Sequence, residues 1–273
     1  MKLAEKFSLL NGEGALVAYI TLGDPSPEES FMIAQSLIDS GNVDVLELGV
    51  PFSDPIADGP VIQAAVDRSL KAGMNTDLAF ELTERLDKKV PVVYLTYYNI
   101  VLQFGIERFM EECERSGVAG IIIADLPYEE SGDVKASCGR HGVDYINIVT
   151  PKTSPERMSM ILKDASGFIY VVSTMGVTGK RENLSAGIRD VVCRALEHSN
   201  GTPVAVGFGI SGPEHVSNVI SMGAQGAIVG SAIVDRIAKG CSIDELLDYV
   251  RELKRSAGFL TPEIKERGHP EQS

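Results

Sequence analysis

Residues 44–60 read DVLELGVPFSDPIADGP. The apolar run in this segment is typical of a buried strand, and it carries one ionisable residue, Glu47, shortly before a loop rich in proline and aspartate. Burial raises the pKa of a glutamate toward neutrality, which suits a general acid or base. Asp58, held on the loop, would face Glu47 across a pocket, and two carboxylates in unlike environments can take unlike roles. The alternative is that Glu47 forms an ion pair in the core, while Asp54 and Asp58 only shape turns.

Short β-branched runs alternate with longer amphipathic segments along the whole chain, which predicts parallel strands joined by helices. Eight such runs read as strands, over residues 16–21, 44–49, 90–95, 119–124, 143–149, 167–172, 203–207 and 225–229. Eight strand–helix units in 273 residues predict an α/β fold of the closed (βα)8 TIM-barrel type. An open doubly wound sheet is the alternative, but it usually has fewer strands, and no Gly-x-Gly-x-x-Gly follows the first strand.

The chain is expected to form a single domain, because no linker or shift in composition divides it. We expect residues 1–260 to form the barrel. Within this range, residues 1–10 would be a short helix that closes the bottom, and residues 75–88 an extra helix before the third strand. Residues 261–273 read as a polar, frayed C-terminal tail.

Composition and charge exclude several classes of protein. No apolar run approaches the roughly 18 residues of a membrane span, and the start, MKLAEK, lacks the apolar core of a signal peptide, so we expect a cytoplasmic protein that does not bind membranes. A net charge of −13 argues against nucleic-acid binding, although a local pocket for one small phosphate remains possible. The cysteines and histidines lack the spacing of ligands, so we expect no metal site.

Glycine-bearing turns follow the last three predicted strands. In a parallel barrel the active site lies at the C-terminal ends of the strands, where backbone N–H groups and helix N-termini commonly bind phosphate. Two of these turns are GFGIS at residues 207–211 and GSAI at residues 230–233. A third, MGVTGK at residues 175–180, is long enough to act as a closing lid. Their joint position predicts a phosphate site.

These residues together resemble a known family, the tryptophan synthase alpha subunit. The segment LELGVPFSDPIADGP, residues 46–60, is similar to that family's signature. The similarity covers essentially the whole chain in order, through TLGDP (21–25), Tyr97 with Asn99, ADLP (124–127), GVTG (176–179), GFGI (207–210) and GSAI (230–233). The resemblance implies a (βα)8 barrel that acts as a lyase in tryptophan biosynthesis. Its reaction would be the retro-aldol cleavage of indole-3-glycerol phosphate to indole and glyceraldehyde 3-phosphate.

The resemblance also implies roles for individual residues. Glu47 would be the acid and base that moves the protons, Asp58 would accept a hydrogen bond from the indole N–H, and Thr178 on the lid would bond Asp58 on closure. A strand-borne Glu and an ionised Asp suit these tasks. We expect an apolar slot for indole to be walled by Tyr19, Leu95, Tyr97, Leu126, Ile148 and Tyr170. We expect the phosphate to be held by Gly179, Gly207, Phe208, Gly230 and Ser231.

The resemblance further implies a partner, a beta subunit that joins indole with serine in an α2β2 heterotetramer. Pyridoxal phosphate would belong to that partner, and this chain would need no cofactor. Lys152 could form a Schiff base in an aldolase, but it lies in a turn open to water. The remaining alternatives are a free-standing indole-glycerol-phosphate lyase, another phosphate-binding barrel enzyme such as an isomerase, and a noncatalytic regulatory subunit. Intact Glu47 and Asp58 count against the regulatory subunit.

Overall fold

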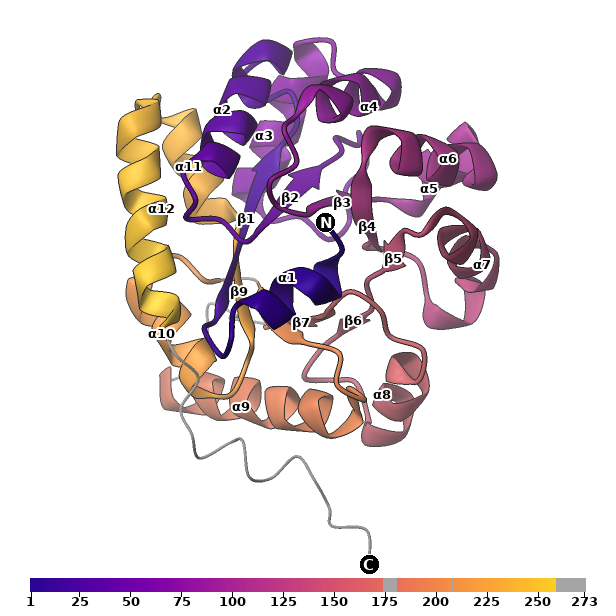
Figure 1. Cartoon of the computed structure of the whole chain (residues 1–273), viewed down its shortest axis with the longest axis vertical. Coiled ribbons are helices and arrows are strands. Elements are labelled where there is room, and N and C mark those ends of the chain that lie inside the picture. Colours follow the sequence, from indigo (N-terminus) through magenta and orange to yellow (C-terminus); the bar gives the residue numbers. More distant parts are fainter. Residues whose placement is uncertain (174–180, 208, 259–273) are drawn as a thin grey trace, which may run out of the picture.

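The fold is a ring of parallel strands surrounded by helices, as a computed structural model of residues 1–173, 181–207 and 209–258 describes it (Figure 1). In these residues the strands are β1 (Ala15–Thr21), β2 (Val45–Gly49), β3 (Val92–Thr96), β4 (Val118–Ile123), β5 (Asp144–Tyr145), β6 (Ile148–Val149), β7 (Ile169–Val172), β8 (Val204–Gly207) and β9 (Gly226–Val229). Their parallel order, β5-β4-β3-β2-β1-β9-β8-β7-β6, confirms the predicted barrel class.

Helices follow the strands and cover the outside of the barrel. They are α2 (Pro27–Asp39), α3 (Pro60–Lys71), α4 (Thr76–Arg85), α5 (Tyr98–Phe104), α6 (Ile106–Ser116), α7 (Gly132–His141), α8 (Pro155–Leu162), α9 (Arg181–His198), α10 (Pro213–Ser221), α11 (Ser231–Ala238) and α12 (Ile243–Ala257), with a 3-10 turn at Tyr128–Glu130. A further helix, α1 (Leu3–Leu9), precedes β1 and lies across one end of the barrel (Figure 1). No helix in the described ranges is long and apolar enough to cross a membrane.

The strand expected over residues 143–149 is interrupted, so the prediction of one continuous strand there is wrong. Its first half, β5, pairs with β4, and its second half, β6, pairs with β7. Between them the backbone passes from one neighbour to the other: Ile146 N–H donates to Ile121 O at 2.9 Å, and Tyr170 N–H donates to Asn147 O at 2.9 Å. The segment bonds to two different neighbours in turn, and by doing so it closes the ring.

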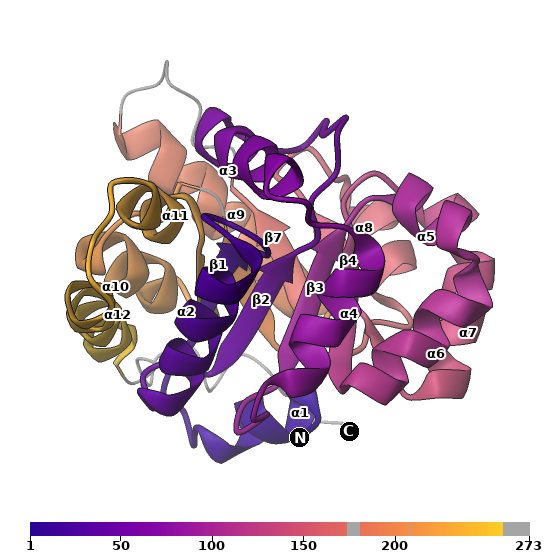
Figure 2. The same ribbon diagram turned by 90° about the horizontal axis from the view of Figure 1, so that it is seen from above.

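The barrel has a packed interior as well as an outer core. Side chains alternate between the two faces of each strand, so every second residue points into the barrel. Each strand around the barrel, or the segment next to it, contributes one or two apolar residues to the interior cluster. Leu3 of α1 packs into this cluster from the bottom. The outward-facing residues pack against the helices in a larger cluster. Because α1 lies at the bottom, the opposite end is left for the active site, and α3 lies there (Figure 2).

A buried aspartate at the bottom joins both ends of the described chain to the barrel. Asp44, just before β2, accepts a hydrogen bond from the backbone N–H of Leu16 at 2.8 Å. Its carboxylate also binds Lys6 of α1 at 3.0 Å and Lys254 of α12 at 2.8 Å. Two lysines and a backbone donor satisfy a carboxylate that burial would otherwise destabilise.

Candidate active site

A cavity of about 130 Å³ opens at the carboxyl ends of the strands. Residues from both halves of the barrel line it: Tyr19, Glu47, Asp58, Gly59, Ile62, Leu95, Tyr170, Gly209, Ile210, Ser211, Ile228, Gly230 and Ser231. The two carboxylates singled out in the sequence thus face the same space. The parallel register explains the position of Glu47, because β1 and β2 pair with Tyr19 opposite Glu47.

Glu47 is the buried acid of this cavity. Its side chain is 1% exposed, and its Oε2 atom has no hydrogen-bond partner. Within the described residues it forms no ion pair, so the alternative of a core salt bridge is not supported. Burial raises the pKa of Glu47 to about 8. The carboxyl group is therefore largely protonated at neutral pH and can donate a proton to a bound molecule.

Asp58 occupies a different environment at the edge of the same cavity. It is half-buried, and burial raises its pKa, while a hydrogen bond from the Tyr97 hydroxyl lowers it. The Tyr97 hydroxyl also accepts a hydrogen bond from the backbone N–H of Ala57 at 3.2 Å, and its ring packs on Phe52 with centroids 5.2 Å apart. Tyr97 therefore holds the loop that carries Asp58, and it is not among the residues that line the cavity.

Tyr19 and Tyr170 line the same cavity as the two carboxylates. Burial raises the pKa of both hydroxyls, and the negative charges of Glu47 and Asp58 add to the effect. Both tyrosines therefore stay neutral. The Tyr19 hydroxyl shares a hydrogen bond of 3.2 Å with Thr21. With Leu95, the rings form an apolar wall of the kind an indole ring needs.

Two glycines give these rings their space. A β carbon at Gly49 would overlap the hydroxyl and ring of Tyr19, and a β carbon at Gly207 would overlap those of Tyr170. At Gly230 a β carbon would approach the Tyr19 ring to 3.2 Å. Gly207 was expected to contact phosphate; it is not among the residues that line the cavity, and its carbonyl accepts hydrogen bonds from the backbone N–H and hydroxyl of Ser173.

The far side of the cavity has the features of an anion site. Gly209, Ile210 and Ser211 line it after β8, and Gly230, the N-cap of α11, and Ser231, its first residue, line it after β9. A helix N-terminus presents free N–H groups and the positive end of the helix dipole to this space. Three of the residues expected here, Thr178, Gly179 and Phe208, lie outside the described residues.

Leu126 and Ile148 line a neighbouring cavity of about 300 Å³, next to the interruption between β5 and β6. Ile148 is also the register partner of Tyr170, which lines the cavity of Glu47, and it packs against the interior cluster that contains Tyr170. Lys152 is exposed and lines neither cavity. In the described part of the chain, no group of three or more His, Cys, Asp or Glu side chains could hold a metal ion.

Sequence reasoning missed some lining residues. Ile62, on the first turn of α3, and Ile228, on β9, both face the cavity. Apolar periodicity assigns such residues to the core and does not distinguish a core position from a cavity wall. Ile62 could have been predicted as a lining residue, because the first turn of α3 directly follows the loop of Asp58 and so has to lie near the same cavity.

The ring of parallel strands, with two carboxylates in unlike environments facing one cavity, places the chain among the (βα)8 barrels. Comparison with known proteins agrees: residues 7–261 match the family model described as tryptophan synthase alpha chain. The tryptophan synthase alpha chain of Methanosarcina barkeri is 46% identical over 256 residues, which cover 93% of this chain and 96% of that protein. That of Methanopyrus kandleri is 48% identical over 244 residues, covering 89% and 88%.

Solved structures show the same likeness. The tryptophan synthase subunit alpha from Campylobacter jejuni is 35% identical, with a TM-score of 0.82, and the match covers 90% of this chain and 98% of that chain. A chain of Mycobacterium tuberculosis tryptophan synthase gives a TM-score of 0.86 at 32% identity, covering 94% and 98%. The chain belongs to the tryptophan synthase alpha chain family. It is a lyase of tryptophan biosynthesis, the alpha subunit, which cleaves indole-3-glycerol phosphate.

Proposed function

We propose that Glu47 and Asp58 together carry out the cleavage of indole-3-glycerol phosphate to indole and glyceraldehyde 3-phosphate. The observation that supports this most is their arrangement in one cavity. Glu47 is fully buried with a pKa of about 8, and Asp58 is half-buried and hydrogen-bonded. One carboxyl group holds a proton at neutral pH, and the other has a hydrogen bond that favours its charged form.

The reaction follows from these two states. Glu47 donates its proton to C3 of the indole ring, and positive charge then develops on the ring nitrogen. Asp58 accepts a hydrogen bond from the indole N–H and stabilises that charge. The bond between C3 and the glycerol carbon breaks as the hydroxyl on that carbon gives its proton to the Glu47 carboxylate. Indole and the aldehyde leave, and Glu47 is protonated again.

Binding is divided between the two sides of the cavity. The indole ring lies against Tyr19, Leu95 and Tyr170, with Tyr97, Leu126 and Ile148 as its further contacts when the site is filled. The phosphate lies at the turns after β8 and β9, held by backbone N–H groups of Gly207, Phe208, Gly230 and Ser231. Gly179 and Thr178 belong to the segment that closes over the substrate, with Thr178 bonding to Asp58.

The chain works in the cytoplasm as the alpha half of an α2β2 complex with a beta subunit. The reaction above uses proton transfer and electrostatic stabilisation, so it calls on no cofactor in this chain. Pyridoxal phosphate acts on the beta subunit, which consumes the indole. The family membership supports this pairing.

The direct test is indole release from indole-3-glycerol phosphate by the purified chain. Activity that survives a chelator and the absence of pyridoxal phosphate supports the proposal. An active chain that never responds to a beta subunit would indicate a free-standing lyase. A chain that binds a beta subunit but releases no indole would indicate a regulatory subunit.

A further inference from the structure

Two residues outside the cavity attach helix α3 to the carboxyl end of β1. Asp24, which follows β1, is 3% exposed. Both of its carboxylate oxygens accept hydrogen bonds from the guanidinium group of Arg68 on α3, with Nε to Oδ1 at 2.7 Å and Nη2 to Oδ2 at 2.9 Å. Two parallel bonds of this kind set orientation as well as distance. The next residue, Ser69, donates its hydroxyl to the carbonyl of Leu22, so α3 is held at two adjacent points.

Helix α3 forms part of the active-site wall. It begins at Pro60, two residues after Asp58, and its Ile62 lines the cavity beside that carboxylate. The buried face of α3 packs on Tyr19, which lines the cavity from β1. The position of α3 therefore decides where Asp58 lies relative to Glu47. It also decides how well the cavity wall shields Glu47 from water.

We propose that Asp24 and Arg68 are a positioning pair, which clasps α3 to the end of β1 and so keeps Asp58 opposite a dry Glu47. Neither residue of the pair lines the cavity, so the pair acts through α3 and not on the substrate. The inference rests on the roles proposed above for Glu47 and Asp58. It adds that Glu47 and Asp58 need Asp24 and Arg68 to hold them in position for efficient catalysis.

The structure offers a matched control at the other end of the barrel. Asp44 is also 3% exposed, and lysines bind it as Arg68 binds Asp24. Removing either carboxylate charge breaks ion pairs made by a buried aspartate with partly exposed cations, which is destabilising. Asp24→Asn and Asp44→Asn should therefore both lower the melting temperature. Only Asp24→Asn should disturb the active site.

The experiment compares Asp24→Asn, Arg68→Lys and Asp44→Asn with the parent chain. We expect Asp24→Asn to lower kcat by about tenfold or more, because small misplacements of a catalytic group are costly in rate. The high-pH limb of its kcat/KM profile should move to lower pH, because water that reaches Glu47 reverses the effect of burial on the pKa. Arg68→Lys keeps the charge but loses the double hydrogen bond, so its effect should be intermediate. Asp44→Asn should keep the parent's kcat and pH profile.

Hydrogen exchange gives a readout that does not depend on activity. The backbone amides of residues 61–66, which follow Pro60 in α3, should exchange faster in Asp24→Asn and Arg68→Lys than in Asp44→Asn. If the two Asp→Asn variants lose activity only in proportion to their melting temperatures, with the pH limb and the exchange of α3 unmoved, the pair is merely structural and the inference fails. If Asp24→Asn does not fold, Arg68→Lys carries the same test. A parent chain that releases no indole overturns the proposed function. The hydrogen-exchange comparison alone then tests whether Asp24 and Arg68 hold α3 in position.

Discussion

The ring of Tyr170 fills the space that a side chain at Gly207 would need. A methyl group added there has to push the ring into the cavity beside Glu47 or deform β8. Overpacking of this kind costs about 1–3 kcal/mol in stability. We expect Gly207→Ala to lower kcat/KM at least about tenfold, through the displaced ring next to the reacting groups.

Gly139→Ala is the control for that substitution. Gly139 lies within α7, and a β carbon there would contact nothing within 4 Å. The change should leave activity intact and stabilise the chain by up to about 1 kcal/mol, because alanine favours a helix more than glycine does. Steady-state kinetics and thermal melts check both variants. Parent-like kinetics for Gly207→Ala would show that the position of Tyr170 does not matter to the site.

Glu47→Gln should abolish cleavage while substrate binding survives. The amide keeps the shape of the side chain but cannot exchange a proton, so the loss should fall on kcat, by about 10²–10⁴-fold. In the parent, kcat/KM should fall as the pH rises through about 8, the pKa of Glu47, since the proton donor is then lost. Near-normal turnover by Glu47→Gln would remove this residue from the mechanism.

The same substitution should change the pH dependence of stability. In the unfolded chain Glu47 loses its proton near 4.5, whereas in the folded chain it holds the proton up to about 8. The folded parent therefore loses stability relative to the unfolded chain as the pH rises between these values. The melting temperature of Glu47→Gln should therefore rise relative to that of the parent as the pH increases over this range, with a relative change of several degrees at the high-pH end. Calorimetry on both, with the exposed Glu5→Gln as control, tests this; a difference that does not vary with pH would contradict it.

Asp58→Asn should lower kcat by about 10²–10³-fold, because the amide keeps the volume of the side chain but loses the charge that stabilises the indole cation. Asp67→Asn, on the exposed face of α3, is the matched control and should behave like the parent. Rates are measured by indole release. Equal rates for the two variants would show that Asp58 does not act electrostatically.

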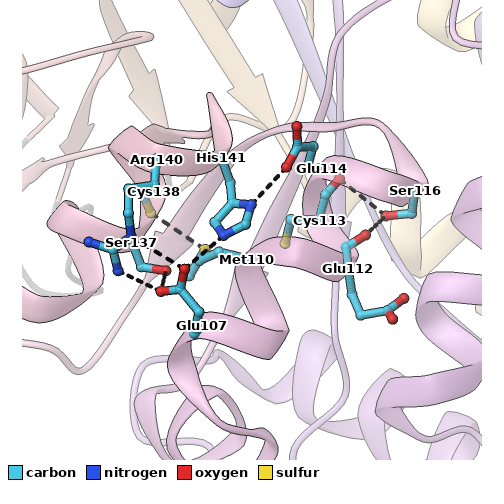
Figure 3. A network of polar contacts seen from close by, with 10 residues as sticks. All are labelled: Glu107, Met110, Glu112, Cys113, Glu114, Ser116, Ser137, Cys138, Arg140 and His141. Carbon is cyan, nitrogen blue, oxygen red and sulfur yellow. Dashed lines mark hydrogen bonds and ion pairs between the residues drawn. The ribbon is translucent and has the colours of Figure 1, made fainter.

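A histidine on the outside of the barrel should make stability depend on pH for a separate reason. His141 bonds Glu114 through Nδ1 at 2.7 Å and Glu107 through Nε2 at 3.0 Å, and Arg140 also binds Glu107 (Figure 3). The hydrogen bonds to Glu114 and Glu107 raise the pKa of His141. Its stabilising effect is therefore full below the ordinary pKa of 6.5 and is lost as the pH rises through the raised value.

We accordingly expect His141→Gln to melt below the parent at about pH 6 and to approach it by about pH 9. Thermal melts across this range measure the gap. His198→Gln, at the end of α9, serves as the control for the loss of a histidine side chain. A gap for His141→Gln that does not vary with pH would mean that its contacts with the carboxylates contribute nothing that depends on its charge.

The chain mixed with a cognate beta subunit should comigrate with it on sizing and release indole faster than alone. A partner can favour the closed state of the active site only by binding that state more tightly than the open one. A coupling free energy of about 1–3 kcal/mol between partner binding and closure would raise activity roughly 5- to 150-fold. A chain that stays monomeric beside that subunit, with an unchanged rate, would contradict the pairing.

Local patterns along the chain are enough to predict the fold class and the buried acid. Alternating apolar runs and amphipathic segments predicted a parallel barrel, and a parallel barrel brings the carboxyl ends of all its strands to one edge. Glu47, inside an apolar strand near that edge, had to be buried beside the loop of Asp58. These conclusions depend only on residues close together along the chain and on the period of their side chains.

The contacts that hold the site together are visible only in the folded barrel. Asp24 meets Arg68 across 44 positions of sequence, Gly207 makes room for Tyr170, and the segment between β5 and β6 closes the ring by changing neighbours. No local sequence pattern predicts such contacts, because a glycine or an ion-pairing residue can occur in a turn, on the surface or under an aromatic ring without any difference in the sequence around it. Their meaning comes from which distant residue the packing of the barrel brings against them.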